Sequence, residues 1–428
     1  MSKKVVFDKG KPKEFQYEFF GPIGALIVVM MTTTVVFGLY FGCNENGCPA
    51  HTQKIISMIQ NTTFIDAYSF QLYLCWLGAL ILAWHVLPGE WVKGLPINEK
   101  GTRLEYKMNG FATSSLVLGI TCGFIYIKGP ECMELVWSRF LPLMTSAYVV
   151  SIFLSVYVYI SSFIGKKQLA EGGNSGNVLY DWFIGRILNP RIGKFDIKVF
   201  CELRPGLILW IFLDIALACR QYVMLNGRIT DSMVLVLIFH VWYVLDSLVC
   251  ESAVLTTIDV TTDGFGYMLS FGDLVWVPFT YSLQARYLSF RPVDLGIGYT
   301  TAIILIQLLG YYIFRGSNSQ KNRFRNDPTH PSVKNLKFIQ TKRGSRLLID
   351  GWWGKSRHMN YFGDWLMAWA WCLPVGFGSA IPYFYVAYFG VLLIHRYGRD
   401  DHKCNEKYGD DWKKYCQIVK YRIIPYVY

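Results

Sequence analysis

The sequence lacks the patterns that mark the common soluble cofactor and metal folds. Its 11 cysteines form no CxxC pair and follow no regular spacing, which argues against a disulfide framework or a structural zinc site. No GxGxxG and no GxxxxGKS/T motif occurs, so binding of a nucleotide in the Rossmann or P-loop manner is excluded. Internal repeats, low-complexity segments, extended linkers and a soluble appendage are also missing.

Apolar sequence is what the chain has in abundance. Of its 428 residues, 53% are hydrophobic and 17% aromatic, and this balance predicts one polytopic membrane protein rather than two or three soluble domains. Runs of about 20 apolar residues can cross a hydrocarbon core of roughly 30 Å. We therefore predict an all-α membrane protein in one domain, with four helices and a loop in residues 1–205 and six helices in 206–428. About ten spans are expected, starting near Phe19, Ala67, Phe111, Val136, Gly206, Ser232, Tyr267, Leu295, Gly363 and Ser379.

Lys and Arg predict the orientation of these spans. Most of the 42 basic residues fall before the first span, in alternate loops and in the C-terminal tail, and cytoplasmic loops retain such residues. Both termini and the two largest polar insertions, 165–204 and 315–363, are thus predicted to be cytoplasmic. The first apolar run is too long and too far from Met1 for a cleavable signal. The net charge of +12 reflects this bias, and no basic stripe supports a nucleic-acid role.

Several local patterns predict details of the loops. On the non-cytoplasmic side Cys43 and Cys48 can pair or remain free thiols, and the sequence leaves both open. Asn61 opens an Asn-Thr-Thr sequon there, a weak signal so close to a span. On the other side, the run RGSNSQKNRFRNDP from Arg315 is too polar to be a helix inside lipid. Residues 335–350 are expected to form a small β-hairpin, and Pro374, Gly376 and Gly378 predict a tight hairpin between the last two spans.

Ionisable residues inside membrane spans are costly and are functional candidates. Asp246, Glu251, Asp259, Asp263 and Asp273 fall in one stretch with no Lys or Arg between Asp246 and Asp273. Neighbouring carboxylates without a counter-charge tend to have raised pKa values, and a protonated carboxyl suits acid catalysis at neutral pH. The alternative is a set of interhelical hydrogen bonds that stabilise the bundle.

Two polar segments bracket the last hairpin, DGWWGKSRHMNYFGDW from Asp350 and RDDHKCNEKYGDDWKKYC from Arg399. Together with Lys321, Arg323 and Arg325 they concentrate cations that suit a phosphate ligand. Trp352, Trp353 and Tyr361 can stack on a purine or nicotinamide ring, and Asn360, Asp364, Asp400 and Asn405 suit ribose hydroxyls. A solvated positive-inside face would explain the charges but not the interleaved Asn, His, Trp and Gly.

These two segments, with NPRIGKFDIKVFCELRPGLILW from Asn189 and TTDGFGYMLSFGDLVWVPFTYSLQARYL from Thr261, resemble the sterol reductases that reduce delta-14, delta-7 and 24(28) double bonds. The resemblance covers nearly the whole chain. It implies a ten-helix NADPH-dependent enzyme, in the endoplasmic reticulum of a eukaryote or the cytoplasmic membrane of a bacterium. The short N-terminus is unlike the lamin B receptor member. The implied NADPH contacts are Lys321, Arg325, Leu348, Trp353, Asn360, Tyr361, Asp400, Cys404, Asn405, Glu406, Lys407, Tyr408 and Tyr415, with Lys321 and Arg325 on the 2′-phosphate.

The resemblance also implies a mechanism. An unactivated alkene does not accept hydride, so an acid first protonates one carbon, and the tertiary cation then takes hydride from the nicotinamide. The sterol pocket must be apolar and dry and lie near a buried acid. The candidate acids or relays are Tyr243, Asp246, Glu251 and Asp400.

The segment from Arg357 and the ending YRIIPYVY favour a delta-14 reductase, with a delta-7 reductase as the alternative. An isoprenylcysteine-type methyltransferase, which uses S-adenosylmethionine, also shows an RHxxY motif and a YGxxYxxY-like tail. It needs only about half this length and leaves Lys321, Arg325 and the FDIKVFCELRPG block unexplained. A non-enzymatic sterol-binding scaffold would leave the acidic stretch and the phosphate-type cluster without a purpose. The sequence does not specify an oligomeric state.

Overall fold

The computed structural model describes residue 15, residues 17–97 and residues 101–428. The lysines between residues 1 and 14, on which the predicted side of the N-terminus rests, lie outside this part of the chain. Helices make up most of the described structure, and six short strands pair as three antiparallel hairpins. The strands are β1 (Glu90–Pro96), β2 (Arg103–Met108), β3 (Arg191–Ile192), β4 (Phe195–Asp196), β5 (Phe338–Gln340) and β6 (Arg346–Leu348).

Nineteen α-helices are assigned within the described residues. They are α1 (Gly21–Gly42), α2 (Thr52–Asn61), α3 (Ala67–Val86), α4 (Gly110–Lys128), α5 (Glu134–Ser138), α6 (Phe140–Ser161), α7 (Val178–Ile184), α8 (Ile197–Leu203), α9 (Pro205–Met224), α10 (Asp231–Val249), α11 (Ile258–Thr261), α12 (Tyr267–Phe271), α13 (Val277–Tyr281), α14 (Leu283–Phe290), α15 (Ile297–Asn326), α16 (Trp352–Lys355), α17 (Met359–Cys372), α18 (Phe384–Tyr408) and α19 (Asp410–Ile418).

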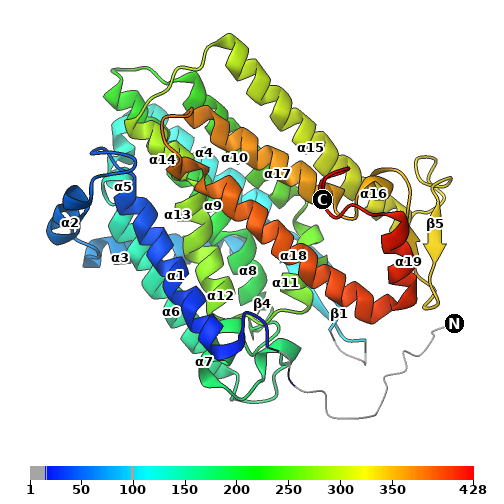
Figure 1. Cartoon of the computed structure of the whole chain (residues 1–428). Coiled ribbons are helices and arrows are strands. Elements are labelled where there is room, and N and C mark those ends of the chain that lie inside the picture. The colour runs from blue at the N-terminus through cyan, green and yellow to red at the C-terminus, as the bar shows by residue number, and fades with distance from the viewer. Residues whose placement is uncertain (1–14, 16, 98–100) are drawn as a thin grey trace.

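Seven helical segments in the described residues are long and apolar enough to cross a membrane, which supports a polytopic membrane protein. They are α1, α3, α4, α6, α8 with α9, α10 and α15. The segment formed by α8 and α9 is 61% buried inside the protein, whereas α1, α3, α4 and α15 are at most 22% buried. Because the outer helices expose apolar side chains, the bundle presents them to lipid and keeps α9 at its centre (Figure 1).

The remaining expected spans are irregular. The segment predicted from Tyr267 is broken into α12, a π-helical turn at Gly272–Trp276, α13 and α14. At this turn the backbone of Asp273 approaches α9 so closely that a Cβ on Gly206 would lie 1.9 Å from the Asp273 carbonyl oxygen. The fourth span begins at Phe140 rather than near Val136, because the short helix α5 precedes it. The last two expected spans form the predicted hairpin of α17 and α18, with α17 only 14 residues long.

Helix α15 is longer than a membrane span requires. Its 30 residues, at 1.5 Å each, extend about 45 Å, well past a hydrocarbon core of roughly 30 Å. The polar run from Arg315, predicted not to be a helix inside lipid, forms the last turns of this helix as far as Asn326. Gly310 and Gly363 let α15 and α17 pack closely, because a Cβ on either would lie within 2.8 Å of the other helix's backbone. The predicted hairpin at residues 335–350 is present as β5 and β6.

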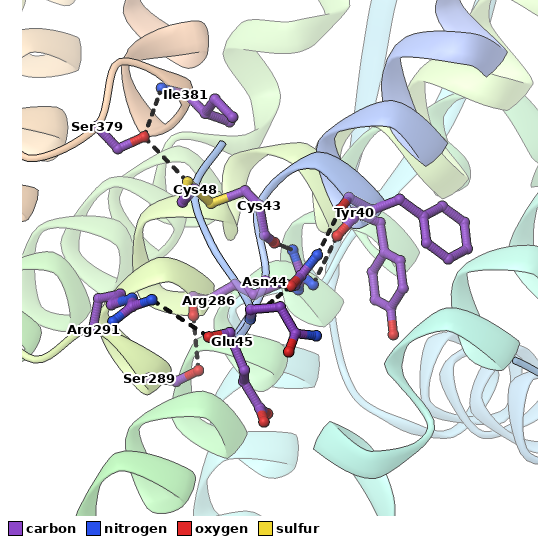
Figure 2. Close-up of a disulfide and its surroundings, with 12 residues drawn as sticks. Tyr40, Cys43, Asn44, Glu45, Cys48, Arg286, Ser289, Arg291, Ser379 and Ile381 are labelled. Carbon is purple, nitrogen blue, oxygen red and sulfur yellow. Dashed lines mark hydrogen bonds between the residues drawn. A yellow bond between two sulfur atoms is a disulfide. The ribbon is translucent and has the colours of Figure 1, made fainter. Parts of the chain in front are cut away.

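A disulfide between Cys43 and Cys48 closes the loop after α1. Figure 2 shows this loop between Arg286 of α14 and Ser379 of the turn between α17 and α18. The buried Arg286 guanidinium donates to the carbonyls of Cys43 at 2.8 Å and Tyr40 at 3.1 Å, so it neutralises the C-terminal end of α1. The Ser379 hydroxyl lies 3.2 Å from the Cys48 sulfur. The loop thus joins three parts of the bundle that are distant in sequence.

Removing this cross-link should destabilise the protein. Replacing Cys43 and Cys48 by serine frees the loop in the unfolded state, at a cost of about 2 kcal/mol, and weakens the contact with Ser379. We expect a lower thermal unfolding midpoint of the purified protein. Serine at the exposed Cys75 and Cys122 is the matched control and should leave the midpoint unchanged. Equal midpoints for both variants, or alkylation of Cys43 without reduction, would contradict the assignment.

Candidate cofactor and active site

The residues expected to hold a cofactor gather at one end of the bundle, around β5, α16, α19 and the C-terminus (Figure 1). Two small apolar clusters build this end. Phe324 of α15 packs with Val333, Leu348 and Trp353 in one. The other joins Trp412, Tyr415 and Val419 with partly buried residues that include Ile339, Leu347 and Cys404. The hairpin β5–β6 lies between the clusters, so it connects the end of α15 to the end of α18 and to α19.

Lys321 lies over an aromatic ring at this end. Its ammonium is 3.9 Å from the centre of the Trp353 ring, and the Trp353 indole N–H donates to the Ser317 carbonyl at 2.8 Å, which fixes the ring. Arg325 is exposed one helical turn further along α15. Among the described residues no carboxylate lies within ion-pair distance of Lys321 or Arg325. Two cations without a carboxylate in contact are suited to an external anion.

His358 connects α17 to α18. Its Nε2 lies 3.3 Å from Oδ2 of Asp400, and its ring stacks on Tyr361 with 4.6 Å between centres. Burial lowers the pKa of His358, and the hydrogen bond to Asp400 opposes this only in part. Burial would raise the pKa of Asp400, but the hydrogen bond from His358 and the charges of Lys321 and Lys403 hold it below its usual range. A neutral imidazole therefore donates to a carboxylate at neutral pH.

The other expected contacts surround this pair. Asn360 has a buried side-chain oxygen that receives no hydrogen bond within the described residues. On the last turns of α18, Cys404 and Tyr408 are half-buried and Asn405, Glu406 and Lys407 are exposed. Tyr415 of α19 is buried and stacks on Trp412 at 4.8 Å. The structure thus brings the ends of α15, α17 and α18 together with β6 and α16, and Tyr415 is buried in the apolar cluster of α19.

These side chains fit a phosphorylated dinucleotide. Lys321 and Arg325 of α15 have no carboxylate partner among the described residues, the Trp353 ring lies beside Lys321, and the unpaired Asn360 oxygen can accept a hydrogen bond from a ribose hydroxyl. Asp364, one turn beyond Asn360 on α17, also has a buried carboxylate oxygen without a hydrogen-bond partner in the described chain. Buried polar atoms that lack a partner commonly face a ligand or water.

The predicted absence of counter-charges along the acidic stretch is wrong for four of its five carboxylates, because cations reach them from other elements. Glu251 pairs with Arg204, Asp246 with Arg315, Asp259 with Arg396 and Asp263 with Arg399. Asp273 has no ion-pair partner in the described residues, and its Oδ2 is buried without a hydrogen bond. The pairs connect residues at least 47 positions apart, so the local sequence carries no signal for them.

The four candidate acids therefore differ in their surroundings. One Glu251 oxygen lies 2.5 Å from Arg204 and the other accepts from the Gly110 N–H at 2.8 Å. Burial raises the pKa of Glu251, with Arg204 opposing the shift, but both of its oxygens tie α4 and α9 together. Asp246 accepts from Tyr311 at 3.0 Å in addition to its Arg315 pair. Asp400 contacts His358.

Tyr243 is different, because its hydroxyl makes no hydrogen bond within the described chain. Its ring lies 4.9 Å from that of Trp371 and 6.1 Å from that of Trp210. One turn away on α10, the fully buried His240 contacts Asp214 at 2.8 Å. An apolar pocket of about 350 Å³ lies elsewhere, between α3, α6, α9 and α13. No candidate acid lines that pocket.

The fold defines a polytopic membrane protein, and one end of its helical bundle gathers cations, aromatic rings and buried polar atoms without a partner in the described chain. Residues 13–428 match the model of the Ergosterol biosynthesis ERG4/ERG24 family. The chain belongs to this family, and the resemblance to sterol reductases is confirmed. It is similar to proteins named delta(14)-sterol reductase from three fungi. The Schizosaccharomyces pombe protein is 67% identical and matches 98% of this chain and 99% of its own. The Saccharomyces cerevisiae protein is 47% identical (97% and 99%), and the Candida albicans protein 43% (98% and 99%).

The surroundings of Glu251 and Tyr243 predict different effects of mutation: a loss of stability for Glu251 and a loss of turnover for Tyr243. Glu251→Gln leaves the buried Arg204 without its counter-charge, which costs about 3–5 kcal/mol, so we expect a large loss of thermal stability and folded yield. Tyr243→Phe removes a hydroxyl without a partner and should leave stability unchanged, while turnover falls about 100-fold or more if that hydroxyl donates the proton. Turnover is measured per folded molecule. Full activity of Tyr243→Phe would exclude Tyr243 as the donor.

Proposed function

We propose that the protein is a delta-14 sterol reductase that uses NADPH to reduce the 14,15 double bond of a sterol. The observation that carries this proposal is the similarity over nearly the full length to three proteins of that name. The clustered cations, aromatic rings and unpaired polar atoms at the end of the bundle support a dinucleotide site.

In this proposal the residues at the bundle end hold NADPH, which supplies the hydride. Lys321 and Arg325 bind the 2′-phosphate, and Trp353 orients Lys321 through the ring contact. The rest of the NADPH molecule is contacted by Asn360 and Tyr361 at the start of α17, by Leu348 of β6 and by the end of α18 from Cys404 to Tyr408. Asp400 accepts from His358, so the carboxylate lies at the junction between the cofactor and the interior of the bundle. Tyr415 packs in the same apolar cluster as Cys404 and Tyr408 and so stabilises the end of α18.

Tyr243 is the proton donor that the geometry favours. The reduction adds a proton at carbon 15 and a hydride at carbon 14, so one residue must deliver a proton inside an apolar region. Glu251 and Asp246 are held by arginines, and further hydrogen bonds from the Gly110 N–H and the Tyr311 hydroxyl occupy their carboxylates. The Tyr243 hydroxyl is free to face a substrate, and Asp400 is the alternative donor beside the cofactor.

The proposed topology has ten spans with both termini in the cytoplasm, in the endoplasmic reticulum membrane. The broken segment from α12 to α14 and the hairpin of α17 and α18 supply the three spans beyond the seven long apolar helices. Disulfides persist in oxidising compartments, so the Cys43–Cys48 loop supports a lumenal position for the end of α1. The cofactor site then faces the cytoplasm, where NADPH is available.

Purified protein in detergent or nanodiscs should oxidise NADPH in the presence of a delta-8,14 sterol, with a product two mass units heavier. A delta-7 sterol should support little oxidation, because the proposed enzyme acts on the 14,15 bond. Turnover of the delta-7 sterol alone would indicate a delta-7 reductase. S-adenosylmethionine binding without turnover would indicate a methyltransferase, and sterol binding without either would indicate a scaffold.

Lys321→Ala with Arg325→Ala tests the phosphate assignment. Each removes a charge-assisted contact worth about 1.5–3 kcal/mol, so the KM for NADPH should rise at least tenfold while activity with NADH changes less than threefold. Alanine at Lys342 and Arg343, exposed on the loop between β5 and β6, is the matched control and should leave both constants unchanged. Equal losses with NADPH and NADH would contradict the assignment.

A further inference from the structure

Lys198 of α8 is a charged residue with no exposed surface. Its ammonium donates to three backbone carbonyls, those of Asp259 at 2.7 Å, Val260 at 3.0 Å and Asp263 at 2.8 Å. An ammonium has three N–H donors, so each of them is used. A buried charge is costly unless such bonds compensate it, and the three bonds fix the backbone of residues 259–263 at the end of α11.

The same short segment points its carboxylates at α18. Asp259 accepts from Arg396 at 2.7 Å. Asp263 accepts from both terminal nitrogens of Arg399, at 2.7 and 3.0 Å. The two arginines are three residues apart, so they lie on one face of α18. The segment is therefore held by Lys198 through its carbonyls, and it holds α18 through its side chains.

The cytoplasmic end of α18 carries Asp400, the next residue after Arg399. Its carboxylate faces His358 at the start of α17. The rotation of α18 is thus set on one side by two Arg–Asp pairs and on the other by the contact between Asp400 and His358. A shift of the 259–263 segment would move both arginines and change where Asp400 lies.

We propose that Lys198 is a positioning residue for the reduction. Its ammonium fixes the 259–263 segment, the carboxylates of this segment fix Arg396 and Arg399, and these place Asp400 at the cofactor. The inference rests on the proposed NADPH site. Of the ionisable side chains, an ammonium is the one that offers three diverging donors in so small a volume, whereas the planar guanidinium of arginine cannot reproduce them.

Lys198→Met tests this role, because methionine is unbranched, uncharged and close to lysine in length. We expect kcat per NADPH-binding molecule to fall at least tenfold and the KM for the sterol to change less than threefold. Binding-competent protein is counted by NADPH titration, so a purely structural loss would lower the amount of competent enzyme but not its kcat. Lys194→Met is the matched control, since Lys194 is exposed four residues earlier, and it should retain full activity.

A second measurement needs no variant and covers the case in which Lys198→Met does not fold. In the unmodified protein, NADPH binding should slow hydrogen exchange of amides 258–263 at least threefold, although this segment lies outside the proposed NADPH contacts. A kcat within twofold of the unmodified enzyme in Lys198→Met, or unchanged exchange of the segment on NADPH binding, overturns the proposal. Failure of the unmodified protein to bind NADPH would instead overturn the cofactor assignment itself.

Discussion

The pairing of Arg396 and Arg399 with Asp259 and Asp263 is the interaction on which the cofactor end of the molecule depends. Helix α18 is the last long helix. In its polar half Tyr397 packs in the main apolar core, and Cys404 and Tyr408 pack against the cluster around Trp412. Two ion pairs on one face add to this packing. Because Asp400 follows directly on the same helix, the pairs also decide which way this carboxylate points.

Buried charges elsewhere in the bundle perform a similar structural task. Arg204 and Glu251 connect α9 to the start of α4 through the Gly110 N–H, and Arg286 binds the carbonyls that end α1. Such groups are expensive to remove from water, and the loss of one partner costs more than the pair contributes. A carboxylate inside the bundle is therefore not by itself evidence of catalysis. Among the four candidate acids, Tyr243 is the one whose polar atom has no hydrogen-bond partner in the described chain.

The two ends of the bundle are built in different ways. At the end where α1 stops, a disulfide loop, a buried arginine and a serine hydroxyl bind three elements to each other. At the opposite end, small clusters around Leu348 and Tyr415 support exposed cations and rings. The first end is cross-linked, and the second carries exposed cations and polar atoms that have no partner in the described chain. This division suits the proposed binding of NADPH at the second end.

The sequence by itself determined the class of fold, the regular spans, the final hairpin and the group of side chains at the proposed NADPH site. Hydrophobic runs depend on local composition, and the cofactor residues fall in dense motifs, so both are visible along the chain. The tertiary structure alone decided that the acidic stretch has counter-charges, that the span after Tyr267 is broken and that Lys198 holds the 259–263 segment. Each of these depends on groups far apart in the chain, such as Lys198 and Asp263, whose contact only the packing of helices brings about. The pairing of Cys43 with Cys48 was likewise open until the fold brought the two thiols together.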